Sequence, residues 1–518
     1  MLDLGSTFIQ SVERSPNALA VVADGQRLTY LQWFDKIRAV AGGLEKLGVQ
    51  HGDHIVVIMQ NRWEMATVHW ACQLLGVIIT PLNWRSKAED IEYCIADSQA
   101  KLLIHDDSCL EAMRELRVSA DIVRVTVGDV CELSGERFED LLNAAPIDAV
   151  SRANANDYSL MLYTSGTTGK PKGVPRRHRH ERAAALAHVA QNLYANGECT
   201  LGVMPLYHTM GVRSLLAMAL IDGCFVCMPK FDVSQALSLI ESEGITNLYL
   251  VPTLYHDLLS HPAFAATDIS QVRKLGFAGA PMSEALLRKI DKAFAPSLFV
   301  NHYGSSEVYT MAINQKAQQK AGSSGRAGLN CRLRVVKLGS TDPNDVVQAL
   351  EEGQIIAHLD GDEAFEGYWN RPDADAKSLN GSWYFTGDIG YVDRDGELFV
   401  SGRVDDMIIS GGENISPVEI ESVISLHPAV DEVAVAGVKD ERWGHKVVAF
   451  VKRQAAVSAE ELDLYCRSTD LANFKRPREY VFVAALPKSP VGKILRRKLV
   501  SGEYDLETST ESSLHATN

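Results

Sequence analysis

A chain of 518 residues is longer than one hydrophobic core usually serves, so two or more domains are expected. Apolar residues make up 46% of the sequence and charged residues 23%, which is ordinary for a soluble globular protein. Lysines and arginines number 51 against 66 acidic residues, and the net charge of −15 disfavours binding to nucleic acid or to an anionic membrane. A binding site for an anionic substrate must therefore contain a local cluster of lysine or arginine side chains.

The start of the chain lacks a basic segment followed by an apolar core, so we expect no secretory signal. Two apolar segments, Met65–Thr80 and Leu215–Met228, are interrupted by polar residues, and neither is predicted to span a membrane. Nine scattered cysteines indicate reduced thiols in a cytoplasmic protein. Cys224 and Cys227 have the spacing of metal ligands, but their apolar surroundings favour a core strand over a zinc site.

Strands and helices alternate along the first part of the chain. A capping-box-like start at Thr29 precedes apolar residues that repeat at helical spacing as far as Leu47. Further elements are predicted at His54–Met59, Trp63–Leu75, Leu102–His105, Ala183–Asn192, Leu248–Val251, Ser283–Ala293 and Leu298–Asn301. This alternation predicts an α/β fold with a mostly parallel sheet covered by helices.

The pattern changes in the last third of the chain. From about residue 323, shorter strands such as Leu333–Leu338, Gly353–His358 and Gly396–Val400 predict a β-rich subdomain that ends near residue 402. Capping-box starts at Ser416 and Ser458, on either side of a strand at Val430–Val438, then predict a compact α+β unit. The polar segment Thr508–Asn518 is predicted to be disordered.

One stretch between Tyr163 and Gly173, with the sequence YTSGTTGKPKG, has the composition of a phosphate-binding loop. Three glycines free the backbone to turn, four serine and threonine hydroxyls offer donors and two lysines supply positive charge. The apolar residues 160–163 before it predict a buried strand, at whose end α/β sheets bind ligands. The spacing excludes a Walker A loop, because Pro171 follows Gly169-Lys170. Taken alone, the stretch is also compatible with an ordinary polar surface loop.

This string resembles the signature of the adenylate-forming superfamily, which includes acyl-CoA synthetases, aryl-CoA ligases, luciferases and the adenylation domains of peptide synthetases. The resemblance implies that Thr164, Ser165, Gly166, Thr167, Thr168, Gly169 and Lys172 bind the phosphates of ATP. Further motifs extend it over most of the chain. It is strongest to aryl-CoA ligases of the benzoate and chlorobenzoate type, in residues 402–415 and 471–497.

Two further motifs match the nucleotide site of that superfamily. In the segment Asn301–Glu307, the resemblance assigns His302, Tyr303 and Ser306 to the nucleotide, and Glu307 to Mg²⁺. Serine stands at position 306 where the family usually has threonine, and the hydroxyl is retained. A cation bound mainly by phosphates needs only one or two protein carboxylates. The turn Phe277–Pro281 matches the second adenine-contacting loop, with Gly279 and Ala280.

The resemblance assigns the ribose hydroxyls to Asp388 and Arg403. A carboxylate accepts from both hydroxyls of a diol, and a guanidinium supplies several donors in a rigid fork. The alternative is an ordinary surface ion pair. Asp405, which follows, matches the position about which relatives pivot their small domain, so we expect an N-terminal domain at 1–402, a hinge at 403–405, a mobile C-terminal domain at 406–505 and a tail at 506–518.

The chemistry itself is assigned to two residues. Lys493 matches the catalytic lysine that reaches between the carboxylate and the α-phosphate, and His208 matches a residue that closes on the carboxylate. For the coenzyme A arm and nucleotide, the resemblance implies Gly411, Gly412, Trp443, Lys475 and Arg476. Trp443 is equally compatible with core packing.

The resemblance thus implies an AMP-forming acid–CoA ligase that uses ATP, Mg²⁺ and coenzyme A. The acid first forms an acyl-adenylate, and the coenzyme A thiol then displaces AMP after the C-terminal domain has rotated. The predicted partners are a small carboxylic acid, neither nucleic acid nor membrane, and, as one option for assembly, a second copy of the chain. A fatty acid–CoA ligase stays open. A carrier-protein adenylation enzyme is disfavoured because no carrier segment follows residue 505, and a silent nucleotide-binding protein because the motif residues are present.

The resemblance to aryl-CoA ligases implies an aromatic or alicyclic carboxylic acid of modest size as the substrate. With this resemblance, its pocket is expected near His208, Thr209, Met210, Val251, Gly279, His302 and Met311. His302 is more polar than the aliphatic residue of chlorobenzoate ligases, which disfavours a halogenated acid. The basic segment 175–180 also departs from the family pattern. Two interpretations stay open, help in gathering ATP or a merely solvated segment, and we favour the solvated one.

Overall fold

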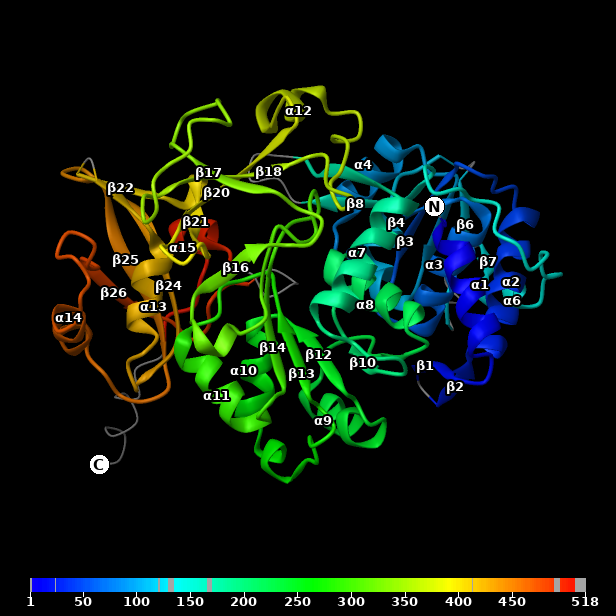
Figure 1. The fold of residues 1–518 in the computed structure, drawn as a ribbon, viewed down its shortest axis with the longest axis horizontal. Coiled ribbons are helices and arrows are strands. Elements are labelled where there is room, and N and C mark those ends of the chain that lie inside the picture. The colour runs from blue at the N-terminus through cyan, green and yellow to red at the C-terminus, as the bar shows by residue number, and fades with distance from the viewer. Residues whose placement is uncertain are drawn as a thin grey trace, which may run out of the picture.

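The computed structural model describes residues 2–23, 25–119, 122–128, 135–164, 170–411, 413–488 and 494–507. Within these ranges the chain forms two large sheets, helices between and around them, and a smaller C-terminal unit at one end of the molecule (Figure 1). No helix in these described ranges is long and apolar enough to cross a membrane. The predicted disordered tail, 508–518, lies outside the described residues.

The first sheet carries the phosphate-loop motif at one edge. Its strand order is β7-β6-β5-β3-β4-β8-β9, and neighbours run parallel except for β8 and β9, which form an antiparallel hairpin. The strands are β3 (His54–Ile58), β4 (Ile78–Leu82), β5 (Leu102–His105), β6 (Val123–Thr126), β7 (Glu136–Arg137), β8 (Tyr158–Thr164) and β9 (Lys172–Arg177). The buried apolar runs of β3 to β5 explain the sheet, since parallel strands covered on both faces are apolar throughout.

The second sheet begins with parallel strands and continues into antiparallel ones. Its parallel part has the order β14-β13-β12-β10-β11-β1, with β2 antiparallel at the edge. These strands are β1 (Leu19–Ala23), β2 (Gln26–Thr29), β10 (Cys199–Gly202), β11 (Cys224–Cys227), β12 (Asn247–Leu250), β13 (Lys274–Phe277) and β14 (Leu298–Tyr303). Cys224 and Cys227 are buried in β11, and the described residues hold no metal-type cluster of histidine, cysteine or acidic side chains. The predicted core strand is confirmed.

The predicted β-rich segment extends the second sheet. Antiparallel strands continue from β14 through β15 and β16 to β21, β20, β18 and β17, while β19 pairs with β20. They are β15 (Ala312–Asn314), β16 (Ser323–Ala327), β17 (Leu333–Val336), β18 (Gly353–His358), β19 (Leu379–Asn380), β20 (Trp383–Val392) and β21 (Leu398–Arg403). The strands are therefore joined to the parallel sheet by hydrogen bonds, and the division at residue 323 stays a prediction.

Helices fill the space between the sheets and cover their outer faces. They are α1 (Leu4–Arg14), α2 (Tyr30–Lys46), α3 (Trp63–Leu75), α4 (Ala88–Ser98), α5 (Leu110–Glu115), α6 (Phe138–Leu142), α7 (His178–Gln191), α8 (Thr209–Leu220), α9 (Val233–Ser242), α10 (Pro252–Ser260), α11 (Glu284–Phe294) and α12 (Pro372–Ser378). Helix α7 contacts β8 and β9 of the first sheet, α8 contacts β10 and β11 of the second, and the two helices pack on each other (Figure 1). The predicted capping box at Thr29 is confirmed, since the Thr29 and Gln32 side chains each accept from the other's backbone N–H.

The C-terminal unit has a core of its own. Its sheet has the order β23-β22-β25-β24, and β26 pairs with β25. The elements are β22 (Ile408–Ser410), β23 (Glu413–Ile415), α13 (Pro417–Ile424), β24 (Val430–Asp440), β25 (Gly444–Arg453), α14 (Ala459–Arg467), β26 (Glu479–Phe482) and α15 (Arg496–Val500). Ser458 forms the predicted capping box. The one predicted at Ser416 is wrong, because the Ser416 hydroxyl donates to the backbone oxygen of Ser401 instead.

Candidate active site

Several predicted site residues follow the carboxyl ends of parallel strands. Val251 follows β12, Gly279 lies two residues after β13, and Tyr303 is the last residue of β14. His208 comes after β10, where it caps helix α8. Because carboxyl ends of parallel strands meet at the same edge of a sheet, the fold gathers these residues as the motifs predict.

The two strands that flank the phosphate-loop motif form a hairpin. Thr164 at the end of β8 pairs with Lys172 at the start of β9, and the Thr164 hydroxyl donates to the Lys172 carbonyl over 3.4 Å. The predicted phosphate-binding residues Ser165, Gly166, Thr167, Thr168 and Gly169 lie outside the described residues. The hairpin therefore fixes where this loop leaves and rejoins the sheet.

Lys172 and Glu307 are brought together by Tyr368, which sequence reasoning did not single out. The ammonium of Lys172 lies 4.1 Å from the centre of the Tyr368 ring, and the Tyr368 hydroxyl donates to Glu307 Oε1 over 2.7 Å. Burial lowers the pKa of Lys172, an effect that the nearby Glu307 carboxylate opposes. A cation and a buried carboxylate thus stand beside the end of the phosphate-loop hairpin.

Arg176 supports this group from inside the protein. Its side chain is fully buried, pairs with Glu181 over 2.8 Å, and donates to the backbone oxygens of Glu307 at 3.2 Å and Glu363 at 2.7 Å. The expectation that the basic segment 175–180 is solvated is wrong. Residues alternate between the two sides of β9, so Arg176 faces the interior while Arg177 forms a partly exposed ion pair with Glu366.

The turn around Glu307 depends on close backbone contacts. A side chain at Gly304 would place its Cβ 2.0 Å from the Tyr309 carbonyl oxygen, so only glycine fits there. The Ser305 hydroxyl accepts from the backbone N–H of Glu307 over 3.2 Å. Ser306, between them, is half-buried, so its hydroxyl side chain remains partly accessible beside Glu307.

Tyr303, Asp388 and Arg403 form a second polar group. Asp388 on β20 and Arg403 on β21 are direct partners in the antiparallel register, and their charged groups lie 3.3 Å apart. The Tyr303 hydroxyl donates to the other oxygen of Asp388 over 2.6 Å. Half of the Arg403 side chain is exposed, against 15% for Asp388. Asp388 and Arg403 thus form an ion pair. Its guanidinium is accessible to solvent, and its carboxylate is mostly buried.

The predicted acid pocket is only partly assembled from the expected residues. His208 Nδ1 accepts from the backbone N–H of Met210 over 3.3 Å, which fixes its ring at the start of α8. A Cβ built at Gly279, where φ is +85°, would lie 3.3 Å from Val251 and 3.8 Å from Met210. Ala280 is half-buried beside it. His208, Met210, Val251 and Gly279 therefore line one region.

His302 lies deeper than the sequence suggested. It is 3% exposed, and its Nε2 donates to Asn192 Oδ1 over 3.1 Å. Its ring packs against His188 and Tyr249. The sequence analysis missed His188, Asn192, Tyr249 and the buried Arg213, although an arginine within the apolar run of α8 was a visible signal. His302 thus belongs to a buried polar cluster.

The predicted catalytic Lys493 lies outside the described residues, but both flanks of its segment are described. Lys488 and Ile494 pair as an isolated bridge, and the Leu495 N–H donates to the Pro487 carbonyl over 2.8 Å. Arg496 then anchors the chain, with two hydrogen bonds of 2.7 and 2.8 Å to the Glu421 carboxylate. The two described flanks of the Lys493 segment therefore lie side by side on the C-terminal unit.

Gly411 and Trp443 are neighbours, as a common role requires. The Gly411 N–H donates to the Trp443 carbonyl over 2.9 Å, and a Cβ at Gly411 would lie 2.9 Å from the indole ring. Trp443 is 40% exposed, which excludes a role as core packing alone. Gly412 lies outside the described residues.

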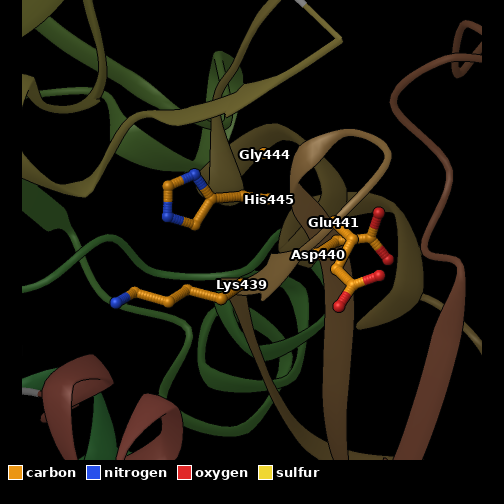
Figure 2. Close-up of a pocket in the computed structure, with 5 residues that line it drawn as sticks. All are labelled: Lys439, Asp440, Glu441, Gly444 and His445. Carbon is orange, nitrogen blue, oxygen red and sulfur yellow. The ribbon is translucent and has the colours of Figure 1, made fainter.

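A shallow depression at the turn between β24 and β25 adjoins this tryptophan. Lys439 and His445 extend together on one side of it, while Asp440 and Glu441 point to the other (Figure 2).

Lys475 and Arg476, which the sequence assigned to coenzyme A and the nucleotide, are bound to carboxylates of the C-terminal unit. Lys475 binds both oxygens of Glu419 at 2.6 and 2.8 Å, and Arg476, 9% exposed, pairs with Asp463. The geometry of Arg476 therefore does not favour a direct phosphate contact.

Two family models together match most of the chain. The model of the AMP-binding enzyme family matches residues 8–369, and that of the AMP-binding enzyme C-terminal domain matches residues 419–493. The chain therefore belongs to the AMP-binding enzyme family. The predicted adenylate-forming superfamily and the predicted α/β fold class are confirmed.

Curated relatives and solved structures agree with this assignment. The chain is 33% identical to 4-chlorobenzoate–CoA ligase from Arthrobacter sp. over 94% of its length and 93% of the relative's. It is 32% identical to the long-chain-fatty-acid–CoA ligase FadD13 of Mycobacterium tuberculosis over 96% and 98%. The anthranilate CoA ligase AuaEII, solved with anthranoyl-AMP, superposes with a TM-score of 0.89 at 27% identity over 96% and 97%. The predicted class of AMP-forming acyl- or aryl-CoA ligase is confirmed, and use of ATP and coenzyme A follows from it.

Proposed function

We propose that this ligase activates an aromatic or alicyclic carboxylic acid, forming first its acyl-adenylate with release of pyrophosphate and then its coenzyme A thioester. Similarity to the 4-chlorobenzoate and anthranilate CoA ligases supports the acid class, and the observation that carries the adenylation step is the convergence of two polar groups. Tyr303, Asp388 and Arg403 form one, while Lys172, Tyr368 and Glu307 form the other. A ribose diol suits the first group, and a polyphosphate with its cation suits the second.

Asp388 and Arg403 hold the ribose in this proposal. The Asp388 carboxylate accepts from both hydroxyls, and the exposed half of Arg403 turns its donors to the same diol. Tyr303, Gly279 and Ala280 contact the adenine from the strand ends. The Ser306 hydroxyl then meets the α-phosphate, because it adjoins Glu307 in the turn.

Glu307 is the residue that would hold Mg²⁺. It presents a single buried carboxylate beside Lys172, and no cluster of three metal-type side chains occurs among the described residues. Such a lone ligand fits a cation bound mostly by phosphate oxygens. When bound, Mg²⁺ neutralises phosphate charge; Lys172 and the loop at 164–169 supply further positive charge and N–H donors.

The first step joins two anions and needs charge neutralisation rather than a base. A carboxylic acid with a pKa of about 4 is already ionised at neutral pH. Lys493 places its ammonium between the carboxylate and the α-phosphate, and stabilises the charge that develops in the transition state. His208, held by its contact with Met210, orients the carboxylate.

The second step brings the thiol of coenzyme A to the same adenylate. Gly411 and Gly412 let the pantetheine arm pass close to the backbone, and Trp443 packs along it. Lys475 would have to leave Glu419 to reach a phosphate of coenzyme A, and Arg476 takes no part in this proposal. Lys493 must leave for this step, so the C-terminal domain rotates about Asp405. Asp405 is exposed and lies in the short helical turn Val404–Asp406 at the junction of the two units, so in this proposal its backbone dihedrals absorb the rotation.

The proposal is tested with a panel of benzoates, cinnamates, cyclohexanecarboxylate and short fatty acids, following AMP release with ATP, Mg²⁺ and coenzyme A. We expect a ring acid to give the highest kcat/KM. Preference for a fatty acid contradicts the assigned acid class, and ATP binding without turnover of any acid contradicts the ligase reaction itself.

A further inference from the structure

Four polar side chains meet in the interior beyond the predicted acid pocket. Arg213 and Tyr249 are each 2% exposed, His188 is fully buried and His302 is 3% exposed. The ring centres lie 4.8 Å apart for His188 and Tyr249, 5.2 Å for His188 and His302, and 5.0 Å for Tyr249 and His302. The guanidinium carbon of Arg213 lies 5.3 Å from the Tyr249 ring centre. We call these four residues the deep polar cluster.

Arg213 is a buried cation whose direct contacts are all to neutral groups. It donates to the backbone oxygen of Tyr309 at 3.2 Å, to the Thr310 hydroxyl at 2.7 Å and to the Tyr249 hydroxyl, while its Nε–H has no acceptor. No carboxylate among the described residues forms a direct ion pair with it; burial raises the pKa of the Glu363 carboxyl, and the charge of Arg213 opposes that shift from beyond direct contact. Buried arginines are rare without such a partner, because the charge loses its hydration.

Asn192 fixes the tautomers of both histidines. Its amide nitrogen donates to His188 Nδ1 over 3.0 Å, so the neutral ring carries its hydrogen on Nε2. Its amide oxygen accepts from His302 Nε2 over 3.1 Å, which leaves His302 Nδ1 as an acceptor. Neither His188 Nε2 nor His302 Nδ1 has a partner. Burial first, and then Arg213, hold the pKa of both histidines well below the usual value, so both are neutral near pH 7.

The deep polar cluster lies next to the predicted acid pocket. Tyr249 stands two residues before Val251 in extended chain, so the two side chains share one face, and Val251 and Met210 line that pocket around Gly279. Helix α8 runs from its cap at His208 to Arg213, five residues on, or about 7.5 Å at 1.5 Å per residue. This rise along the helix axis is comparable to the distance from the carboxylate of a ring acid to a substituent on the far side of the ring.

We infer that the deep polar cluster recognises an oxygen substituent, a hydroxyl or a second carboxylate, on the part of the acid far from its reacting carboxylate. The inference rests on the proposed function. A hydroxyl satisfies all three unpartnered atoms, since its oxygen accepts from Arg213 Nε–H and His188 Nε2–H and its hydrogen is donated to His302 Nδ1. A second carboxylate accepts from the same two donors and adds a negative charge beside Arg213. An alkyl or halogen substituent leaves all three atoms unsatisfied, which a site of this kind strongly rejects.

Matched acids test the inference on the whole enzyme. Benzoates with hydroxyl, carboxylate, methyl or chloro groups at the meta and para positions are compared by kcat/KM for AMP release, and by acid-dependent pyrophosphate exchange. We expect the better oxygen-substituted acid of each series to exceed its methyl counterpart by about 100-fold or more. Comparison of the hydroxyl- and carboxylate-substituted benzoates then shows which oxygen group the deep polar cluster recognises.

Two variants link such a preference to the cluster. His188→Phe and His302→Leu should each reduce the ratio of kcat/KM for the preferred acid over its methyl analogue by about 10-fold or more, and the ratio cancels general losses of activity. The control is His69→Phe, a buried histidine of α3 that also has an unpartnered Nε2 and should keep the wild-type ratio.

Several outcomes overturn the inference. Wild-type enzyme that uses methyl or chloro acids as well as oxygen-substituted ones contradicts it, as does a ratio unchanged in both histidine variants. If a variant does not fold, the wild-type ratio still decides. Adenylation of unsubstituted or chloro acids alone overturns the inference but keeps the proposed function, whereas the absence of pyrophosphate exchange with every acid overturns both.

Discussion

Replacing Arg176 by methionine should cost both stability and activity, for reasons that can be separated. The substitution removes the buried ion pair with Glu181 and the hydrogen bonds to the Glu307 and Glu363 carbonyls. A carboxylate left buried without its partner costs about 3–5 kcal/mol. The Glu307 turn also loses the donor that holds its backbone, so we expect adenylation to fall by about 10-fold or more at temperatures where the variant is folded.

The double variant Arg176→Met, Glu181→Leu separates the two effects. Removing both charges should recover at least half of the lost stability, since an apolar pair of similar volume replaces the ion pair well. It should not recover adenylation, because the contact with the Glu307 carbonyl is still missing. Arg177→Met is the matched control: its ion pair with Glu366 is partly exposed, so the loss should stay below about 1 kcal/mol.

The assays are chemical denaturation followed by fluorescence, and acid-dependent pyrophosphate exchange at varied Mg²⁺ concentration. A single Arg176 variant as stable as wild type would refute the claim that the charge of Glu181 depends on Arg176. A double variant with wild-type exchange would refute the positioning of Glu307 by Arg176.

Three further predictions concern the moving parts. Lys493→Ala should lower adenylation by about 10²–10³-fold yet spare thioester formation from synthetic acyl-adenylate; equal losses in both half-reactions contradict the two-conformation scheme. Asp405→Pro should keep pyrophosphate exchange but form little thioester, and a fully active proline variant would count against the hinge. His256 of α10 contacts Asp431 of β24 across the two units at 2.8 Å, and Asp257 first, then Asp431, raise its pKa. Because the pKa of His256 is raised in the folded protein, its protonated form stabilises the contact fully at pH values below the ordinary histidine pKa. This stabilisation is lost as the pH rises through the pKa of His256 in the folded protein. His256→Ala should therefore loosen the C-terminal unit, seen as faster hydrogen exchange in β24, at pH 6 but not at pH 9; equal exchange in variant and wild type at pH 6 would contradict this.

Patterns local in sequence predicted much of the fold. The strand before the phosphate-loop motif, the helix that starts at Thr29 and the strands near residues 54, 102 and 298 are where periodicity and capping placed them. Ser416 shows the limit of such patterns. Its sequence has the form of a capping box, but a contact with Ser401, fifteen residues away, takes the hydroxyl.

The site was predictable where a motif carries it and not where tertiary packing makes it. Asp388 and Arg403 come from separate motifs, and the antiparallel register of β20 and β21 brings them together. Tyr368 has no motif of its own, and only the fold sets it between Lys172 and Glu307. The basic segment at 175–180 looked solvated because composition does not reveal which strand face turns inward.

The most direct test of the account is a crystal structure of the enzyme with a non-hydrolysable acyl-adenylate analogue. We predict that the ribose hydroxyls contact Asp388 and Arg403, that the adenine lies against Tyr303, and that the Lys493 ammonium approaches the acyl and phosphate oxygens in at least one domain arrangement. An adenosine bound elsewhere, or a Lys493 side chain in bulk solvent in every arrangement observed, would contradict it.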